Sequence, residues 1–182
     1  EFLKFVHLPI ILPKRRKTKK LNYGKELEQK YVKVLKNAYK DTFPNRTFYN
    51  YREDDLDNKV SIVDGTRHDQ LIAMMKKDEA VAIFFPNLLQ GYSIIASREQ
   101  VVNLPPGFAL AGGFDTFTAM VMYTGTLARD YHTPGLNLAA LSWQSNGYSF
   151  CLGAGVGGLY FVCTDYLADT LGGYSSGVVF LG

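Results

Sequence analysis

Residues 148–163 read Tyr-Ser-Phe-Cys-Leu-Gly-Ala-Gly-Val-Gly-Gly-Leu-Tyr-Phe-Val-Cys, two apolar runs on either side of a glycine-rich centre. Aromatic and β-branched residues favour strands, and clusters of glycine mark the turns between them. The pattern predicts strands over 148–152 and 159–163, joined by a turn at 153–158.

The same character extends over residues 107–182, the glycine-rich β half of the chain. These 76 positions hold 14 of the 17 glycines and five charged residues, where an average composition would place about 19. Further β-prone runs lie at 116–123, 136–143 and 178–181. We therefore predict a mainly antiparallel β domain, built like a sandwich or a barrel.

The low charge of this half also bears on partners. A soluble surface normally carries mixed charges. We expect protein neighbours in an oligomer or larger assembly to cover part of residues 107–182.

The segment before the β half mixes strands and helices. Residues 60–63 form a short apolar run, and Asp64-Gly65-Thr66 can turn the chain into a helix that reaches about residue 77. The runs 80–85 and 92–96 are separated by Pro86 and Gly91, which predicts an antiparallel pair of strands.

An amphipathic helix is predicted over residues 23–40. Its apolar positions follow helical spacing and its lysines occupy the remaining positions. The helix should end before Phe43-Pro44, because a residue that precedes proline avoids the α region. The apolar positions are Leu27, Tyr31, Val34, Leu35 and Ala38.

A strongly basic segment lies ahead of this helix. Residues 14–20 read Lys-Arg-Arg-Lys-Thr-Lys-Lys, six cations in seven positions, and such blocks repel themselves and stay extended. Residues 1–40 carry 12 basic and three acidic side chains, a net charge of +9; residues 41–182 carry eight and 14, a net charge of −6. The sequence thus predicts an α+β protein with a basic arm at 1–22 and one domain at 23–182.

The arm carries the main functional hypothesis. Clustered cations release counterions from a polyanion and bind it without regard to sequence. We expect a non-catalytic assembly subunit, laid out like a coat protein or a ribonucleoprotein component, whose arm contacts RNA or another polyanion. The residues predicted to bind the polyanion are Lys14, Arg15, Arg16, Lys17, Lys19, Lys20, Lys25 and Lys33.

A competing hypothesis is a nucleotide- or ligand-binding enzyme domain. The turn Gly153-Ala-Gly155-Val-Gly157-Gly158 resembles the GxGxxG turn of FAD- and NAD-binding flavoproteins. The resemblance implies a helix over 159–171 that receives the pyrophosphate at its N-terminus. Only 24 residues follow Gly158, and the acidic residue that the family places roughly 20 residues later is missing.

A membrane-associated subunit and a nucleophilic enzyme have weaker support in the sequence. Residues 136–164 lack formal charges, which leaves membrane association as a third hypothesis. Cys151 with His132 and Asp130 or Asp115 could form a nucleophilic site, although a buried thiol explains Cys151 more simply. The three histidines lack metal-ligand spacing, so we predict no metal, no cofactor and no catalytic residue, and the sequence indicates no compartment.

Overall fold

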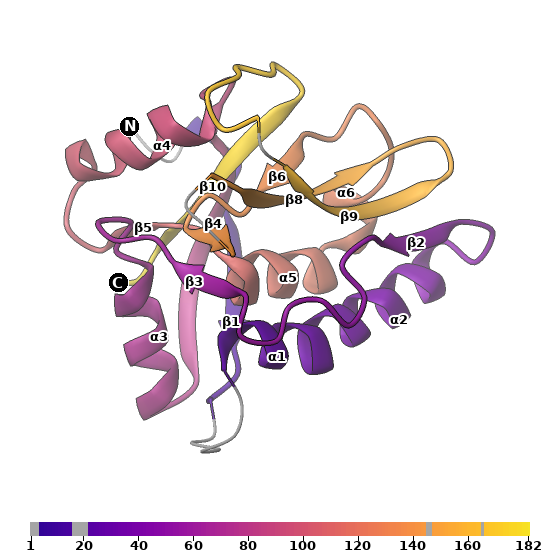
Figure 1. Cartoon of the computed structure of the whole chain (residues 1–182), viewed down its shortest axis with the longest axis horizontal. Coiled ribbons are helices and arrows are strands. Elements are labelled where there is room, and N and C mark those ends of the chain that lie inside the picture. The colour runs from indigo at the N-terminus through magenta and orange to yellow at the C-terminus, as the bar shows by residue number, and fades with distance from the viewer. Residues whose placement is uncertain (1–3, 16–21, 145–146, 165) are drawn as a thin grey trace.

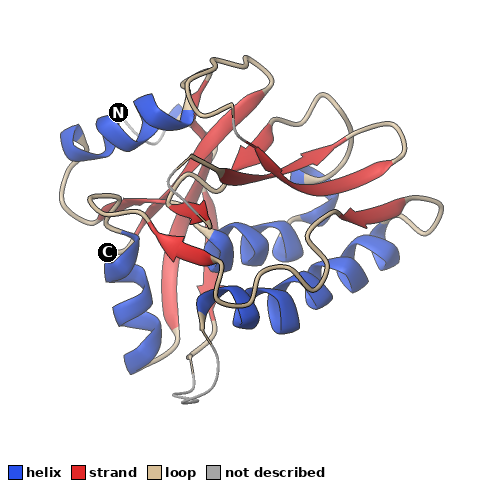
Figure 2. Cartoon of the chain, in the orientation of Figure 1, coloured by secondary structure: helices blue, strands red, loops and turns tan. Residues whose placement is uncertain are grey.

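A mixed β-sheet with helices against both of its faces forms the framework of this chain (Figures 1 and 2). The structure is a computed structural model that describes residues 4–15, 22–144, 147–164 and 166–182. The sequence-based prediction of an α+β fold is confirmed.

The main sheet has the strand order β1-β4-β10-β6-β8-β9-β2, and β5 pairs with β10 beside this path. Most pairs are antiparallel, while β6 with β10 and β2 with β9 are parallel. A small second sheet joins β3 to β7. The strands are β1 (Leu8–Leu12), β2 (Thr47–Asn50), β3 (Val60–Ile62), β4 (Ala80–Gln90), β5 (Phe108–Leu110), β6 (Gly135–Asn137), β7 (Leu141–Trp143), β8 (Ser149–Ala154), β9 (Gly158–Thr164) and β10 (Tyr174–Phe180).

The helices divide between the two faces of the sheet. A larger core lies between one face and the helices α1, α2, α3 and α5, and a smaller core lies between the other face and α4. The helical segments are α1 (Tyr23–Glu26), the π-helical η2 (Leu27–Val32), α2 (Lys33–Thr42), α3 (His68–Lys77), α4 (Ile94–Gln100), the 3₁₀ turn η3 (Val101–Asn103), α5 (Gly113–Met122) and α6 (Thr124–Leu127).

The amphipathic helix predicted over 23–40 is confirmed as a continuous run of α1, η2 and α2, and it ends before Phe43. The π-helical turns were not predicted, and they change which side chains are buried. Tyr31 and Val32 both enter the core, whereas Val34, expected on the buried face, is 52% exposed. A π turn winds less tightly than an α turn, so positions after it rotate away from the 3.6-residue spacing.

The strand predicted over 116–123 is wrong, because this segment forms α5. The helix is buried almost all round, so it lacks the polar stripe by which a surface helix is recognised. Its start is fixed by Asp115, whose carboxylate accepts a hydrogen bond of 2.9 Å from the backbone N–H of Gly112.

The antiparallel pair predicted over 80–85 and 92–96 is also wrong. Strand β4 runs from Ala80 to Gln90 through Pro86, and residues 94–100 form α4. The partner strand β10 has a register shift opposite Pro86, and β1 pairs only as far as Phe84. Proline is tolerated there because the ladder needs no N–H from it.

Strand β1 corrects the view of residues 1–22 as an arm outside the domain. Leu8–Leu12 pair antiparallel with β4, and Ile10 and Leu12 are fully buried in the larger core. The domain therefore includes this strand.

The remaining predictions of strands and helices are mostly confirmed. The β8–β9 hairpin, β3 and α3 lie where the sequence placed them, and 136–143 divides into β6 and β7. Strand β10 overlaps the run predicted at 178–181 but begins at Tyr174 and ends at Phe180. Within the described residues, no helix is long and apolar enough to cross a membrane.

Candidate ligand-binding site

Side chains alternate between the two faces of β6, β8 and β9. One face contributes to the hydrophobic core, and the other carries the candidate binding site. Phe150, Leu152, Leu159 and Phe161 are fully buried on the side of the larger core. The intervening residues therefore point to the opposite face, since successive side chains of a strand alternate. This second face carries glycine, tyrosine and small polar residues.

One row of paired residues crosses this face from β10 to β2. Tyr174 pairs with Gly135, and Gly153 pairs with Tyr160, which in turn pairs with Tyr49. Directly paired residues point to the same face of a sheet. The row therefore has tyrosines at its ends and two glycines in its middle, and the Tyr174 side chain lies over both glycines.

Gly135 allows the ring of Tyr174 to lie against the backbone of β6. A Cβ at position 135 would come within 2.5 Å of Cε1 of Tyr174. Because real Cβ atoms do not approach ring carbons so closely, any other residue would push the ring off the sheet.

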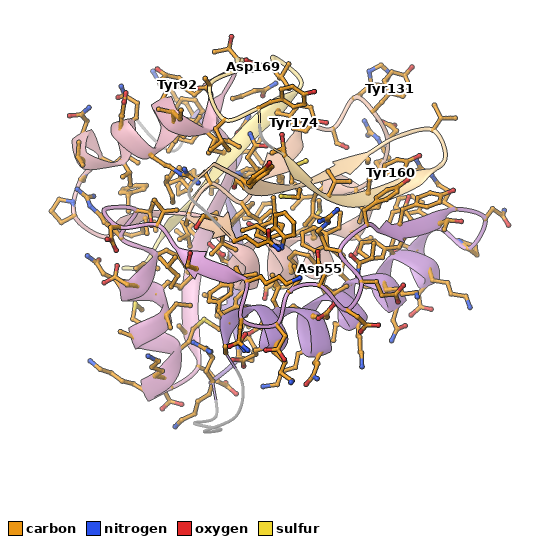
Figure 3. All side chains as sticks on the ribbon, in the orientation of Figure 1. Asp55, Tyr92, Tyr131, Tyr160, Asp169 and Tyr174 are labelled. Carbon is orange, nitrogen blue, oxygen red and sulfur yellow. The ribbon has the colours of Figure 1, made fainter. Side chains whose placement is uncertain are left out.

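A cavity of about 310 Å³ opens beside Tyr174. Figure 3 shows Tyr92, Asp169 and Tyr174 near one another, with Tyr160 further along the sheet and Tyr131 apart from them. The cavity lies within the size range of small-molecule sites. It is lined by Tyr92, Ile94, Asn137, Cys151, Val162, Cys163, Thr164, Tyr166, Asp169, Leu171 and Tyr174.

Asn137 is the polar group at the floor of this cavity. Its side chain is 7% exposed, and no described residue hydrogen-bonds its amide. It stands in a second cross-strand row, between Ser176 of β10 and Cys151 of β8. The Oγ of Ser176 is also buried and has no partner among the described residues. Buried polar groups in proteins are normally hydrogen-bonded, so this floor has unused hydrogen-bonding capacity.

The cavity carries little charge. Burial, with a smaller contribution from Cys163, raises the pKa of the Cys151 thiol to about 12, so Cys151 remains protonated at neutral pH. Burial and then Cys151 raise the pKa of the Tyr174 phenol as well. Among the described residues that line the cavity, Asp169 carries the formal charge, and it lies at the exposed rim.

A stack of tyrosines continues the same face beyond the cavity. The rings of Tyr49 and Tyr160 lie 4.9 Å apart and 7° from parallel, and Tyr51 stacks beside both. Tyr51 is 56% exposed, so the stack ends in a solvent-facing aromatic side chain.

The glycine-rich turn at 153–158 does not have the surroundings that its resemblance to flavoproteins implies. Residues 158–164 form β9, so the expected helix over 159–171 is wrong and the turn closes a β-hairpin. Gly158 passes beside β2, where a Cβ would meet the carbonyl oxygen of Thr47 at 1.8 Å. The glycine at position 158 therefore allows β9 and β2 to pack closely.

The structure places the predicted polyanion-binding residues in different surroundings. Lys14 and Lys33 are exposed. Arg15 is largely buried, because its guanidinium donates to the Glu26 carboxylate at 2.6 and 2.9 Å and lies over the Phe114 ring. Lys25 pairs with Asp57 at 2.7 Å. Arg16, Lys17, Lys19 and Lys20 lie outside the described residues.

The residues considered for a nucleophilic site serve other contacts. Asp115 caps α5 in the core, and Asp130 accepts a hydrogen bond from the backbone N–H of His132. Cys151 faces the cavity as a protonated thiol.

A buried polar cluster joins α1, α3 and α5, and nothing in the sequence predicted it. The Tyr23 hydroxyl accepts the N–H of Gly113 at 2.9 Å and lies 3.0 Å from Nε2 of His68. His68 is fully buried, and this burial lowers its pKa, against the opposing effect of Asp115. His68 is therefore neutral in the folded protein.

This cluster predicts a loss of stability in mild acid. As pH falls below about 6.5, unfolded His68 takes up a proton that folded His68 resists, so the free energy of unfolding falls. Burial raises the pKa of Asp115, which acts in the opposite direction. We expect urea unfolding between pH 7 and 5 to show this loss in the parent protein and in H132Q, which alters an exposed histidine. The loss should be smaller in H68Q. If the free energy of unfolding fell equally with pH in the parent protein, H132Q and H68Q, His68 would not be the cause.

The cavity could not be predicted from the sequence because its residues come from β6, β8, β9 and β10 and from residues 92–94 and 166–171. Only strand register brings Asn137, Cys151 and Tyr174 together. The sequence matches no protein-family model, no curated protein and no solved structure.

Proposed function

We propose that the cavity beside Tyr174 binds an uncharged carbohydrate, and that the chain acts as a binding protein through it. The observation that supports the proposal is Asn137, a buried amide that no described residue hydrogen-bonds. The Asn137 amide is not among the fully buried atoms without a partner, so it is accessible from the cavity that it lines, where a ligand can hydrogen-bond it. Its carbonyl accepts and its NH₂ donates, which matches sugar hydroxyls that do both.

The walls of the cavity support the same class of ligand. Tyr92, Tyr166 and Tyr174 offer apolar ring faces together with hydroxyl groups. The C–H face of a sugar ring can pack on such a ring while its hydroxyls reach Asn137 and Thr164. A few polar groups in an otherwise apolar and aromatic cavity are typical of small-molecule sites.

The charge of the cavity disfavours a phosphorylated ligand. Phosphate groups are held by Arg, Lys or clustered N–H groups, and the titratable groups that line this cavity are Asp169, tyrosines and cysteines. A carboxylate at the rim instead accepts hydrogen bonds from neutral hydroxyls. Tyr160 and Tyr49 lie further along the same face of the sheet and add aromatic surface beyond the cavity.

A binding screen tests this proposal. Neutral mono- and disaccharides, and uncharged nucleosides as the competing class, would be titrated by calorimetry and by thermal shift. We expect a saccharide to bind, and N137A and Y174A each to weaken it about tenfold, the effect of losing roughly 1.4 kcal/mol of contact. Y131A, which removes an exposed tyrosine outside the cavity, is the matched control. Binding of a nucleoside in preference to every sugar would overturn the choice of ligand, and unchanged affinity in N137A would overturn the site.

Assembly into a larger complex with polyanion contact is a second candidate function. Lys33, Lys36 and Lys40 lie on the exposed side of α2, and none of them has an ion-pair partner among the described residues. Ile11 of β1 and Val81 of β4 are direct cross-strand partners and are 57% and 70% exposed. The lysines favour anionic partners, and the exposed apolar pair favours a protein neighbour.

This second candidate predicts strong salt dependence. If lysines on α2 contact phosphates, the triple variant K33Q/K36Q/K40Q should bind single-stranded RNA more weakly, with a slope of log K against log salt lower by about two. K76Q/K77Q removes two exposed lysines from α3 and serves as a control for the loss of net positive charge. The measurement is fluorescence anisotropy across a salt series. An unchanged slope in the triple variant would exclude α2 from the contact.

A further inference from the structure

An apolar groove of about 410 Å³ lies among β1, the helix formed by α1, η2 and α2, and α5. Figure 1 shows α5 beside the helix formed by α1 and α2, with β1 at their common end. These elements supply the walls of the groove. The lining residues are Ile11, Pro13, Lys14, Glu26, Lys30, Tyr31, Val34, Phe117, Thr118, Val121 and Met122.

Three large apolar side chains in these walls are only half covered by the protein. Ile11, Val34 and Met122 are 57%, 52% and 44% exposed. Val34 is among them because the π-helical turns of η2 rotate it out of the core. Apolar side chains that gather around one concave surface gain free energy when an apolar group covers them.

The polar part of the groove is cationic. Glu26 accepts hydrogen bonds from Arg15 on one oxygen and from Lys30 at 2.9 Å on the other. Arg15 balances the charge of Glu26, and Lys14 pairs with Asp78 at 3.6 Å. One positive charge, that of Lys30, therefore remains in excess at the groove. Lys14 and Lys30 are about half exposed and both line the groove.

We propose that this groove binds a free long-chain carboxylate, with the alkyl chain along Val34, Val121 and Met122 and the carboxylate at Lys30 and Lys14. The apolar walls match the chain, and the net positive rim matches the head group. Because a lysine is a flexible point charge, Lys30 can contact a second anion while Arg15 continues to hold Glu26. This site is separate from the carbohydrate site and does not depend on it.

The probe for this proposal is dodecanoate below its critical micelle concentration, titrated into the full chain by calorimetry. Dodecanol and dodecyltrimethylammonium carry the same chain with a neutral and a cationic head. We expect dodecanoate to bind, dodecanol to bind more weakly and the cationic probe to bind weakest. Equal affinity for all three probes, or no binding of dodecanoate, would overturn the proposal.

Two variants locate the head group and the chain. K30A should weaken dodecanoate binding about fivefold, the scale of an exposed ion pair, while K36A on the same helix but outside the groove should not. V34E adds a negative charge at an exposed position and should abolish binding while the melting temperature is unchanged. Equal weakening by K30A and K36A would overturn the head-group assignment. Binding to neutral lipid vesicles that survives V34E would show that the chain contacts a membrane by another surface.

Discussion

Replacement of Gly24 by alanine is expected to cost about 3 kcal/mol or more of folding free energy, the upper range for a side chain added to a packed interior. A Cβ at this position would lie 1.9 Å from the carbonyl oxygen of Leu56 and 2.9 Å from Cγ2 of Val60. The Leu56 oxygen belongs to backbone, and Val60 is held in β3 against β7. Neither atom can move aside as the end of a flexible side chain could.

The measurement for G24A is thermal unfolding, where a loss of this size lowers the melting temperature by about 10 °C in a chain of this length. G172A is the control, because no atom lies within 4 Å of its Cβ position. Equal melting temperatures for G24A and the parent protein would contradict the close packing of α1 against residues 56–60.

Replacement of Glu26 by glutamine is expected to destabilise the protein by about 3 kcal/mol, the usual scale for removing one partner of a buried ion pair. The side chains of Glu26 and Arg15 are 4% and 13% exposed. The substitution keeps the shape of the side chain but leaves the Arg15 guanidinium, packed over Phe114, without its anion.

The same pair predicts an acid effect. Burial raises the pKa of Glu26, but hydrogen bonds and charges from Arg15 and Lys30 outweigh burial and hold the pKa below its ordinary value. A depressed carboxyl pKa gives stability that is present above the unfolded pKa and is lost as pH falls through the folded value. The difference in the free energy of unfolding between E26Q and the parent protein should therefore become smaller below pH 4.5. Urea unfolding measures it.

D78N is the matched control for E26Q, because Asp78 pairs with Lys14 at 3.6 Å at an exposed position. Exposed pairs contribute little, so D78N should unfold at the same temperature as the parent protein. If E26Q were as stable as D78N at pH 7, the buried pair would not hold β1 and α1 together.

The elements that were predicted correctly have local signals. Lysines and apolar residues alternate with helical spacing over 23–40, and a glycine cluster separates two β-prone runs over 148–163. In both segments one face is buried and the other is not, so the sequence carries a period.

The elements that were missed lack that contrast. Helix α5 is buried on nearly every side, and its threonine, valine and phenylalanine residues favour strands when taken alone. Strand β4 passes through Pro86 only because its neighbours leave that position unpaired. Tertiary packing therefore determines the secondary structure of both segments.

The candidate site depends still more on packing across the sheet. Asn137 follows two residues after Gly135, a spacing without meaning until β6 lies between β10 and β8. The predicted polyanion-binding residues were found from a dense run of charge in the sequence. The sequence does not show, however, that Arg15 in this run is buried and paired with Glu26.

The most direct test of the carbohydrate proposal is the NMR signal of the Asn137 side-chain amide during titration with the saccharide that the screen identifies. We predict that its NH₂ resonances shift with the same dissociation constant as calorimetry gives, while the side-chain amide of Asn37, exposed on α2, does not shift. Saturable sugar binding that leaves the Asn137 resonances unchanged would contradict the account.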